Sequence, residues 1–157
     1  MRSRVFGVLL TLAACCCFAA PTLANESANA TITEHTVDPK ATEVIGLFIA
    51  AFGESDEDAR WKAVFPLMHS STFNRDGTEV HSNFKRLIGR KASAITGAQS
   101  PPKIDKVERM TYPEDKPFSA GQLRATVVDR YVVAGNGGSF KVMIYTEDGV
   151  PRIINVQ

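Results

Sequence analysis

The sequence lacks an excess of charge of either sign, since 18 Lys and Arg residues stand against 17 Asp and Glu residues. A chain with a formal net charge of +1 has no basic surface of the kind that nucleic acid or an anionic membrane would require. Internal repeats and low-complexity segments are also absent from the sequence. We therefore expect a globular protein with one core of ordinary size and no nucleic acid as a partner.

Long hydrophobic runs are scarce, and the most extended one covers residues 5–20 with Thr11 as its only interruption by a polar side chain. This run is shorter than the ~20 residues that a membrane-spanning helix needs. Arg2 and Arg4 precede it, and Thr22-Leu23-Ala24 follows it with small residues where a signal peptidase requires them. The order predicts a signal peptide over 1–24, cleavage after Ala24, and a periplasmic or secreted protein.

A second processing site competes with this one. Residues 12–15 (LAAC) resemble a bacterial lipobox, at which a diacylglyceryl group on Cys15 would anchor the protein to a membrane. A lipidated cysteine is usually followed by polar residues, whereas residues 16–18 (CCF) continue the apolar run. We favour cleavage after Ala24, and only the alternative would place the protein on a membrane.

Cysteine is missing from the whole chain after Cys17. Cleavage after Ala24 would remove all three cysteines, and with them any disulfide, thiolate ligand or cysteine nucleophile. This excludes cysteine hydrolases, zinc ribbons and iron–sulfur sites. The fold must then be held together by packing alone.

Residues 25–37 are polar without an apolar period, and they predict a disordered leader before a folded domain over 38–157. Apolar residues at helical spacing then predict helices over 39–52, 56–65 and 78–88. We expect Asp38, Ser55 and Thr78 to cap these helices, and Pro66 and Gly89 to end the second and third.

After residue 90 the spacing of apolar residues shortens from the helical period towards the period of two that is typical of strands. Residues 92–102 predict a connector, 104–112 a weakly patterned strand and 112–121 a loop. Strands over 123–134, 139–147 and 150–156, joined by glycine-containing turns, predict an antiparallel meander. The predicted core consists of apolar residues from both halves: Val44, Phe48, Phe52, Trp61, Phe65, Phe84, Leu87, Val127 and Ile144. Helices followed by a meander indicate a single α+β domain, in which three N-terminal helices pack on a curved antiparallel sheet.

Four segments carry a resemblance to a known fold: 41–53 (ATEVIGLFIAAFG), 60–68 (RWKAVFPLM), 84–89 (FKRLIG) and 148–153 (DGVPRI). They resemble the three helices and the last hairpin of the nuclear transport factor two-like (cystatin-like cone) superfamily, particularly its small bacterial periplasmic members of uncharacterised function. The resemblance implies a cone-like α+β fold, although Pro151 stands where the family has a tryptophan. It does not imply one activity, because the superfamily mixes isomerases, dehydratases, hydrolases, carriers and binding modules.

Asp129 is the most unusual residue of the strands. Strict alternation places it on one face with Leu123, Ala125, Val127, Tyr131 and Val133. If that face lines the cone, a carboxylate there would have a raised pKa, a tyrosine hydroxyl as its partner, and the capacity for acid/base catalysis. If instead a β-bulge near 127–128 shifts the register, Asp129 points to solvent beside Arg130. We favour the second interpretation.

Aromatic residues supply the candidates for a binding site. Trp61, Phe65, Tyr112 and Tyr131 could line a ligand site, although packing in the core is the favoured interpretation for each of them. His69, Asp76 and His81 could be considered as metal ligands, but they fall on separate elements. We therefore expect no metal and no cofactor. A nucleophile-elbow sequence is also lacking.

The leading hypothesis is an exported module of the cell envelope that binds a small apolar molecule or a protein partner without catalysis. The alternative is a small cofactor-independent isomerase or dehydratase, in which Asp129 acts as acid/base beside Tyr131. A third interpretation is a structural or inhibitory protein that acts through an exposed sheet face. An enzyme needs converging polar groups inside a pocket, whereas a carrier needs apolar walls.

Overall fold

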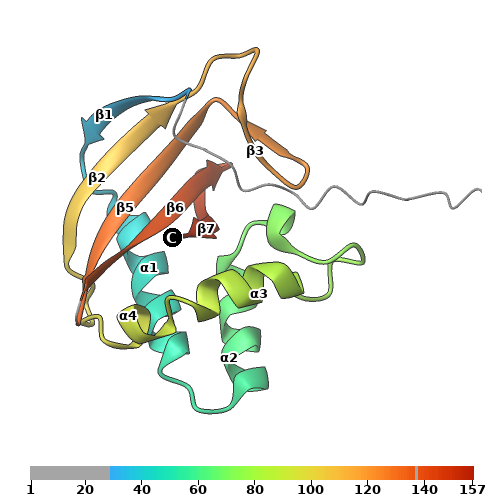
Figure 1. The fold of residues 1–157 in the computed structure, drawn as a ribbon, viewed down its shortest axis with the longest axis vertical. Helices are drawn as coiled ribbons and strands as arrows, with labels where there is room; N and C mark the ends of the chain where they lie inside the picture. The colour runs from blue at the N-terminus through green and yellow to red at the C-terminus, as the bar shows by residue number, and fades with distance from the viewer. Residues whose placement is uncertain (1–28, 137) are drawn as a thin grey trace, which may run out of the picture.

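The computed structural model describes residues 29–136 and 138–157. The predicted signal peptide, the lipidation site at Cys15 and the first residues of the predicted leader lie outside this part of the chain. The described residues form an α+β fold with four α-helices and a mainly antiparallel five-stranded sheet (Figure 1). None of the helices in these two ranges is both long enough and apolar enough to cross a membrane.

The five strands follow the spatial order β1-β2-β5-β6-β7, and every neighbouring pair is antiparallel. The predicted meander is confirmed by β5, β6 and β7. Asp148 and Gly149, which join the last two strands, both have positive φ, as two-residue hairpin turns require. The strands of the sheet are β1 (Thr31–His35), β2 (Ile104–Thr111), β5 (Val127–Gly135), β6 (Gly138–Glu147) and β7 (Val150–Val156).

Strand β1 lies within the segment that was predicted to be a disordered leader, and for these residues the prediction is wrong. All five residues pair with β2, from Thr31 opposite Thr111 to His35 opposite Val107. The strand stands at the edge of the sheet with its side chains largely exposed, so its sequence shows no apolar period. Because β1 precedes the helices, the helices are not the N-terminal part of the fold.

The first helix is confirmed with its predicted bounds. Helix α1 (Pro39–Phe52) begins after Asp38, whose carboxylate accepts a hydrogen bond from the Lys40 backbone N–H. Helix α2 (Glu57–Val64) is capped by Asp56 rather than by Ser55, because the Asp56 carboxylate accepts the Ala59 N–H at 2.7 Å. A 3-10 turn, Phe65–Leu67, follows it and accommodates Pro66, and a second such turn covers Ser70–Thr72.

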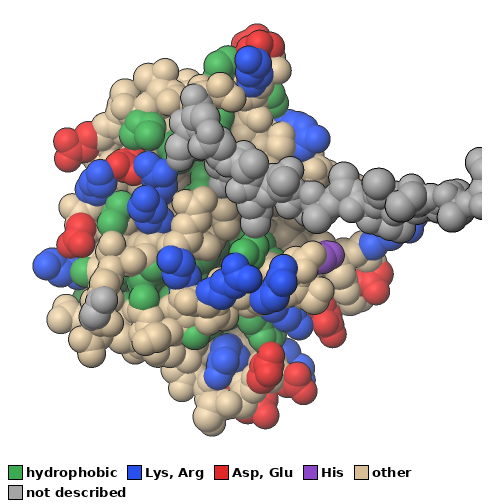
Figure 2. All heavy atoms as spheres, in the orientation of Figure 1, with side chains coloured by type: hydrophobic (Ala, Val, Ile, Leu, Met, Phe, Trp, Pro, Cys, Tyr) green, Lys and Arg blue, Asp and Glu red, His purple; other side chains and the backbone are tan. Residues whose placement is uncertain are grey.

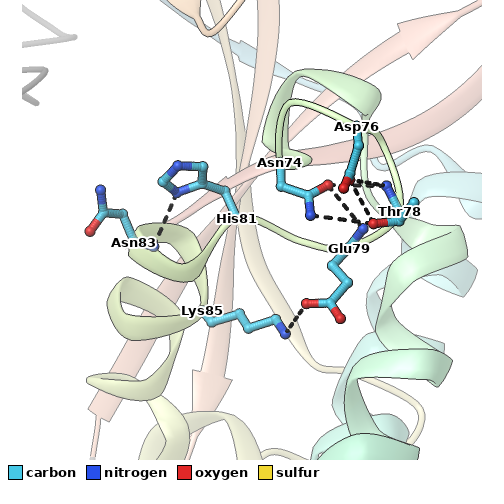
Figure 3. A network of polar contacts seen from close by, with 7 residues as sticks. All are labelled: Asn74, Asp76, Thr78, Glu79, His81, Asn83 and Lys85. Carbon is cyan, nitrogen blue, oxygen red and sulfur yellow. Dashed lines mark hydrogen bonds and ion pairs between the residues drawn. The ribbon is translucent and has the colours of Figure 1, made fainter.

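The third helix starts later than predicted. Thr78 belongs to a turn in which both its N–H and its hydroxyl donate to the Asp76 carboxylate (Figure 3). Helix α3 (Ser82–Gly89) begins only after His81, whose ring Nδ1 accepts the Asn83 N–H at 3.2 Å. The connector predicted over 92–102 contains a fourth helix, α4 (Ala92–Thr96), so the expected count of three helices is wrong.

The helices and a small hairpin cover opposite faces of the sheet. On the helix side, α1 contributes Ile45 and Phe48 to a core shared with β5 and its neighbours. On the other side, the hairpin of β3 (Phe118–Ala120) and β4 (Leu123–Ala125) packs over a second apolar cluster. In Figure 1 this hairpin stands at one end of the sheet and the helices α2, α3 and α4 lie near the other. It replaces part of the loop predicted over 112–121 and the beginning of the long strand predicted over 123–134.

The predicted core is confirmed for Phe48, Phe52 and Ile144, which are buried. Four of the other predicted residues pack against the core while partly buried: Val44, Trp61, Phe65 and Phe84. Leu87 is half-buried, and its neighbour Ile88 takes the fully buried position on α3. Val127 is 40% exposed, so its placement in the core is wrong. It faces the helix side of the sheet, but at an end that the helices leave open.

Candidate functional site

Asp129 faces the helix side of the sheet. Tyr131 and Val133 belong to the core beneath α1, and alternation along β5 puts Asp129 on the same face. The irregularity expected near 127–128 occurs instead at Thr126, between β4 and β5, and it turns Ala125 towards the hairpin cluster. The favoured interpretation, with Asp129 in solvent beside Arg130, is therefore wrong.

The partner of Asp129 is an arginine, not the tyrosine hydroxyl that we expected. Arg109 lies directly opposite Asp129 in the β2–β5 register. Its Nε donates to Oδ1 at 2.8 Å and its Nη2 to Oδ2 at 2.9 Å. The side chains of Arg109 and Asp129 are 38% and 17% exposed. The bond to Asp129 raises the pKa of Arg109, and the two contacts form a bidentate guanidinium–carboxylate pair.

Sequence reasoning missed Arg109 because its role depends on strand register. Alternation in the strand predicted over 104–112 puts Arg109 on the same face as Val107. Which residue of another strand stands opposite cannot be read from either strand alone, since β2 and β5 are joined through the hairpin and the break at Thr126. The only available signal was that Arg109 shares a strand face with Val107.

Tyr131 is buried next to the start of α1. Its hydroxyl oxygen accepts a hydrogen bond from the Asp38 N–H at 3.4 Å. Burial, assisted by the nearby Asp129 and Asp38 carboxylates, raises the pKa of Tyr131 to about 12. The phenol is therefore neutral throughout the physiological range, and it lies on the same face of β5 as Asp129.

We expect an alkaline titration followed by tyrosine absorbance to show one of the three tyrosines ionising only near pH 12. Because the folded-state pKa of Tyr131 is raised above its usual 10.0, the native state binds this proton more tightly than the unfolded state. The resulting stabilisation is present below pH 10 and is lost as the pH rises towards about 12. Tyr131→Phe should remove the late transition, while a Tyr145→Phe control should retain it.

The surroundings of the ion pair define a patch that we call the Arg109–Asp129 site, consisting of these two residues with Thr33, Thr111 and Val127. Thr33 is opposite Arg109 on β1, and Thr111 is opposite Val127 in the next row of the sheet. Thr33, Thr111 and Val127 are all exposed. The site is thus a solvent-facing end of the helix-side sheet surface, with an ion pair amid threonine and valine side chains.

The four aromatic candidates are not brought together. Trp61 packs edge-on against Phe52 at 5.9 Å between ring centroids, and Phe65 stacks on Phe73 at 4.2 Å. Both belong to the helical side of the core. Tyr112 lies on the opposite face of the sheet beneath the β3–β4 hairpin. Only Tyr131 neighbours the Arg109–Asp129 site.

The three residues considered as metal ligands each have a local structural role. The buried His69 ring accepts the Ser71 N–H through Nδ1 at 3.0 Å, and its Nε2 lies 3.7 Å from a Glu147 carboxylate oxygen. Asp76 holds the turn before α3, and His81 caps that helix, as Figure 3 shows. Over residues 29–136 and 138–157, no group of three or more His, Cys, Asp or Glu side chains is placed to hold a metal ion.

A second set of ion pairs lies on the hairpin side of the sheet. The Arg130 guanidinium and the Lys106 ammonium both bind the Glu108 carboxylate, at 2.6 and 2.5 Å. Burial by itself would raise the pKa of Glu108, but the bonds from Lys106 and Arg130 outweigh this effect and lower the pKa. Figure 2 shows a row of basic side chains over α3, where Arg86 and Arg90 are exposed.

Comparison with family models, with curated proteins and with solved structures gives no match for this chain. No relative therefore lends an activity or a ligand to the Arg109–Asp129 site. Its function has to be inferred from its own geometry and charges.

Proposed function

We propose that this chain is an exported, non-catalytic binding module of the cell envelope, and that the Arg109–Asp129 site holds its ligand. The supporting observation is the pair of bonds from Arg109 to the two oxygens of Asp129. A general base must reach a substrate proton and accept it. Arg109 contacts both oxygens of the Asp129 carboxylate, so a substrate proton would have to compete with the guanidinium for them, and the pair is better arranged as a fixed binding group.

The chemistry of the site favours a small, largely apolar ligand with one uncharged polar group. The pair is neutral overall, so it attracts neither anions nor cations strongly. A guanidinium has five N–H donors, and the bonds to Asp129 use two of them. The remaining donors belong to a patch that also contains Thr33, Thr111 and Val127, and this combination suits an amide, carbonyl or hydroxyl group on an apolar body. A protein partner that presents such groups is the other ligand class in this proposal.

Export and the cone-like architecture are parts of the same proposal. The sequence order of residues 1–24 supports a cleaved signal peptide and a periplasmic or secreted protein, with lipidation at Cys15 as the alternative. Helices on one face of a five-stranded antiparallel sheet support membership of the nuclear transport factor two-like superfamily. The open end of the helix-side surface would then be the mouth of the cone.

The catalytic alternative is an isomerase or dehydratase in which Asp129 transfers a proton beside Tyr131. The two residues share a face of β5, which supports this alternative. It requires that a substrate displace Arg109 from Asp129. A displacement of this kind breaks a two-bond charged contact, so we rank catalysis second.

Native mass spectrometry of the protein purified from its own host tests the proposal. We expect a chain that begins at Asn25 and carries the additional mass of a small molecule. Arg109→Gln should lower ligand occupancy at least about tenfold, since bonds to charged groups contribute about 1.5–3 kcal/mol. Arg86→Gln, an equal charge change on exposed α3, is the matched control and should retain the ligand.

Two outcomes contradict the proposal in different ways. A wild-type protein without any additional mass, or a ligand that Arg109→Gln retains in full, rules out binding at this site. A full-length chain rules out export with cleavage, and a diacylated chain beginning at Cys15 shows that the alternative processing site is used. Turnover of the bound molecule by the wild type but not by Asp129→Asn would favour the catalytic alternative.

A further inference from the structure

The two edges of the sheet differ in how they are covered. Along β7, Met68 forms a parallel bridge with Ile153, and the His69 N–H donates to the Ile153 carbonyl oxygen at 2.9 Å. The Arg152 guanidinium also donates to the Pro66 carbonyl oxygen. The chain around residues 66–69 therefore closes this edge against further strands.

The opposite edge is open. Within residues 29–136 and 138–157, β1 pairs with β2 only, and its register with β2 runs without a shift over all five residues. Natural edge strands usually carry lysine, proline or a bulge that hinders the addition of another strand. The sequence of β1, TITEH, has neither lysine nor proline, and its Ile32 side chain is 43% exposed.

The backbone groups that face outward can be assigned from the hydrogen-bond pattern. The Tyr112 N–H donates to the Thr126 carbonyl oxygen, so even-numbered residues of β2 bond towards β5. Odd-numbered residues of β2 then bond towards β1, because the direction alternates along an antiparallel strand. By the register, Thr31, Thr33 and His35 bond to β2, and the N–H and C=O groups of Ile32 and Glu34 point away from the sheet.

The charge at this edge indicates what could be added. Glu34 stands directly opposite Glu108, and like charges in such cross-strand pairs are unfavourable. Glu108 has Lys106 and Arg130 as cationic partners. No ion pair joins Glu34 to a cation of the described chain. A cationic side chain on an added strand would supply the missing counter-charge.

We propose that β1 is a docking edge for an extended segment of a protein partner, which adds a strand with Lys or Arg beside Glu34 and an apolar side chain beside Ile32. In this mode, main-chain hydrogen bonds provide affinity and the alternate side chains provide specificity. The edge shares only Thr33 with the Arg109–Asp129 site, and the backbone groups of Thr33 bond to β2, so the two binding events are independent proposals.

A second copy of this chain fits the edge less well. Outward-facing residues must pair with outward-facing residues, which in an antiparallel β1–β1 pair places Ala30, Ile32 or Glu34 of one copy opposite Glu34 of the other. None of these residues is a cation, and the last would add a further like charge. The segment that docks is therefore inferred to come from a different protein.

A titration of the isotope-labelled protein with the peptide acetyl-Thr-Lys-Thr-Val-Thr-amide, followed by amide NMR shifts, tests this inference. The lysine would stand beside Glu34 and the valine beside Ile32 in an antiparallel strand. We expect saturable shifts centred on the Ile32 and Glu34 amides. The same peptide with glutamate in place of lysine should bind about two- to thirtyfold more weakly, because it loses an attraction of about 0.2–1 kcal/mol and gains a repulsion of similar size.

Three variants test whether the peptides bind at the β1 edge. Glu34→Lys should reverse the preference between the two peptides, while Glu43→Lys, the same charge change on exposed α1, should leave it unaltered. Ile32→Pro removes an outward N–H without removing a β1–β2 bond, so it should weaken both peptides while the protein stays folded.

Several results would overturn the inference. These are the absence of saturable shifts with either peptide, shifts centred on β7 or on Arg109 and Asp129, or a peptide preference that Glu34→Lys does not reverse. Self-association of the peptide-free protein in sedimentation equilibrium, abolished by Ile32→Pro, would show that a second copy occupies the edge instead. Arg109→Gln should bind the peptides normally, so failure of the proposed function and failure of this inference are distinguishable.

Discussion

Replacing Phe48 with alanine should lower the free energy of unfolding by about 3–5 kcal/mol. The Phe48 side chain is fully buried between α1 and the sheet, and its ring centroid lies 5.0 Å from that of Phe52. Truncation removes the transfer free energy of the ring and leaves a cavity that the surrounding α1 and sheet side chains cannot fill. Equilibrium urea denaturation, with the slope of the transition compared between variants, measures the change.

Phe84→Ala is the matched comparison. The sequence pattern predicts the same burial for Phe84 as for Phe48, but Phe84 on α3 is only partly buried. Less apolar area returns to water on truncation, so we expect a loss of about 1–2 kcal/mol. Equal losses in the two variants would contradict the placement of α3 at the rim of the core.

The elements that the sequence predicts best are those whose signals are local. Helix α1 has an aspartate cap, a proline in its first turn and apolar residues at helical spacing, and all of these agree. The meander of β5, β6 and β7 combines alternation with glycine-containing turns. Where a residue suits two local structures, the sequence predicts the wrong helix start. Thr78 is a residue type that often caps a helix, but the Asp76 carboxylate holds it in a turn.

Elements and contacts that depend on pairing between strands far apart in the chain cannot be predicted from local sequence patterns. Strand β1 has no apolar period because it is an edge strand, and only its pairing with β2 orders it. The irregularity at Thr126 turns the side chains of Leu123 and Ala125 to the hairpin side of the sheet, while Asp129 stays on the helix side. Alternation therefore places Asp129 and Tyr131 on one face correctly, whereas the Arg109 partner depends on a register that no local pattern encodes.

The Arg109–Asp129 pair should respond unequally to the loss of its two members. Arg109→Leu leaves a carboxylate that is largely withdrawn from water without its partner, and we expect a loss of about 1–3 kcal/mol in the free energy of unfolding. Asp129→Leu leaves a guanidinium that is more exposed, on a long side chain that can extend into solvent. This variant should lose about 1 kcal/mol or less.

The double variant, Arg109→Leu with Asp129→Leu, decides whether the pair serves stability or binding. Both polar groups are then replaced by apolar ones on a sheet face that already carries Val127 and Ile144, so stability should return to within about 1 kcal/mol of the wild type. Ligand occupancy should remain lost, because the donors of the Arg109–Asp129 site are gone. Urea denaturation and native mass spectrometry on the same four proteins measure the two quantities.

The two possible results for the double variant lead to opposite conclusions about the Arg109–Asp129 site. A double variant as unstable as the sum of the single variants would mean that Arg109 and Asp129 stabilise the fold independently of one another, which contradicts the role of the ion pair as a coupled unit. Recovery of stability without recovery of the ligand would mean that the fold does not need this ion pair and that binding does.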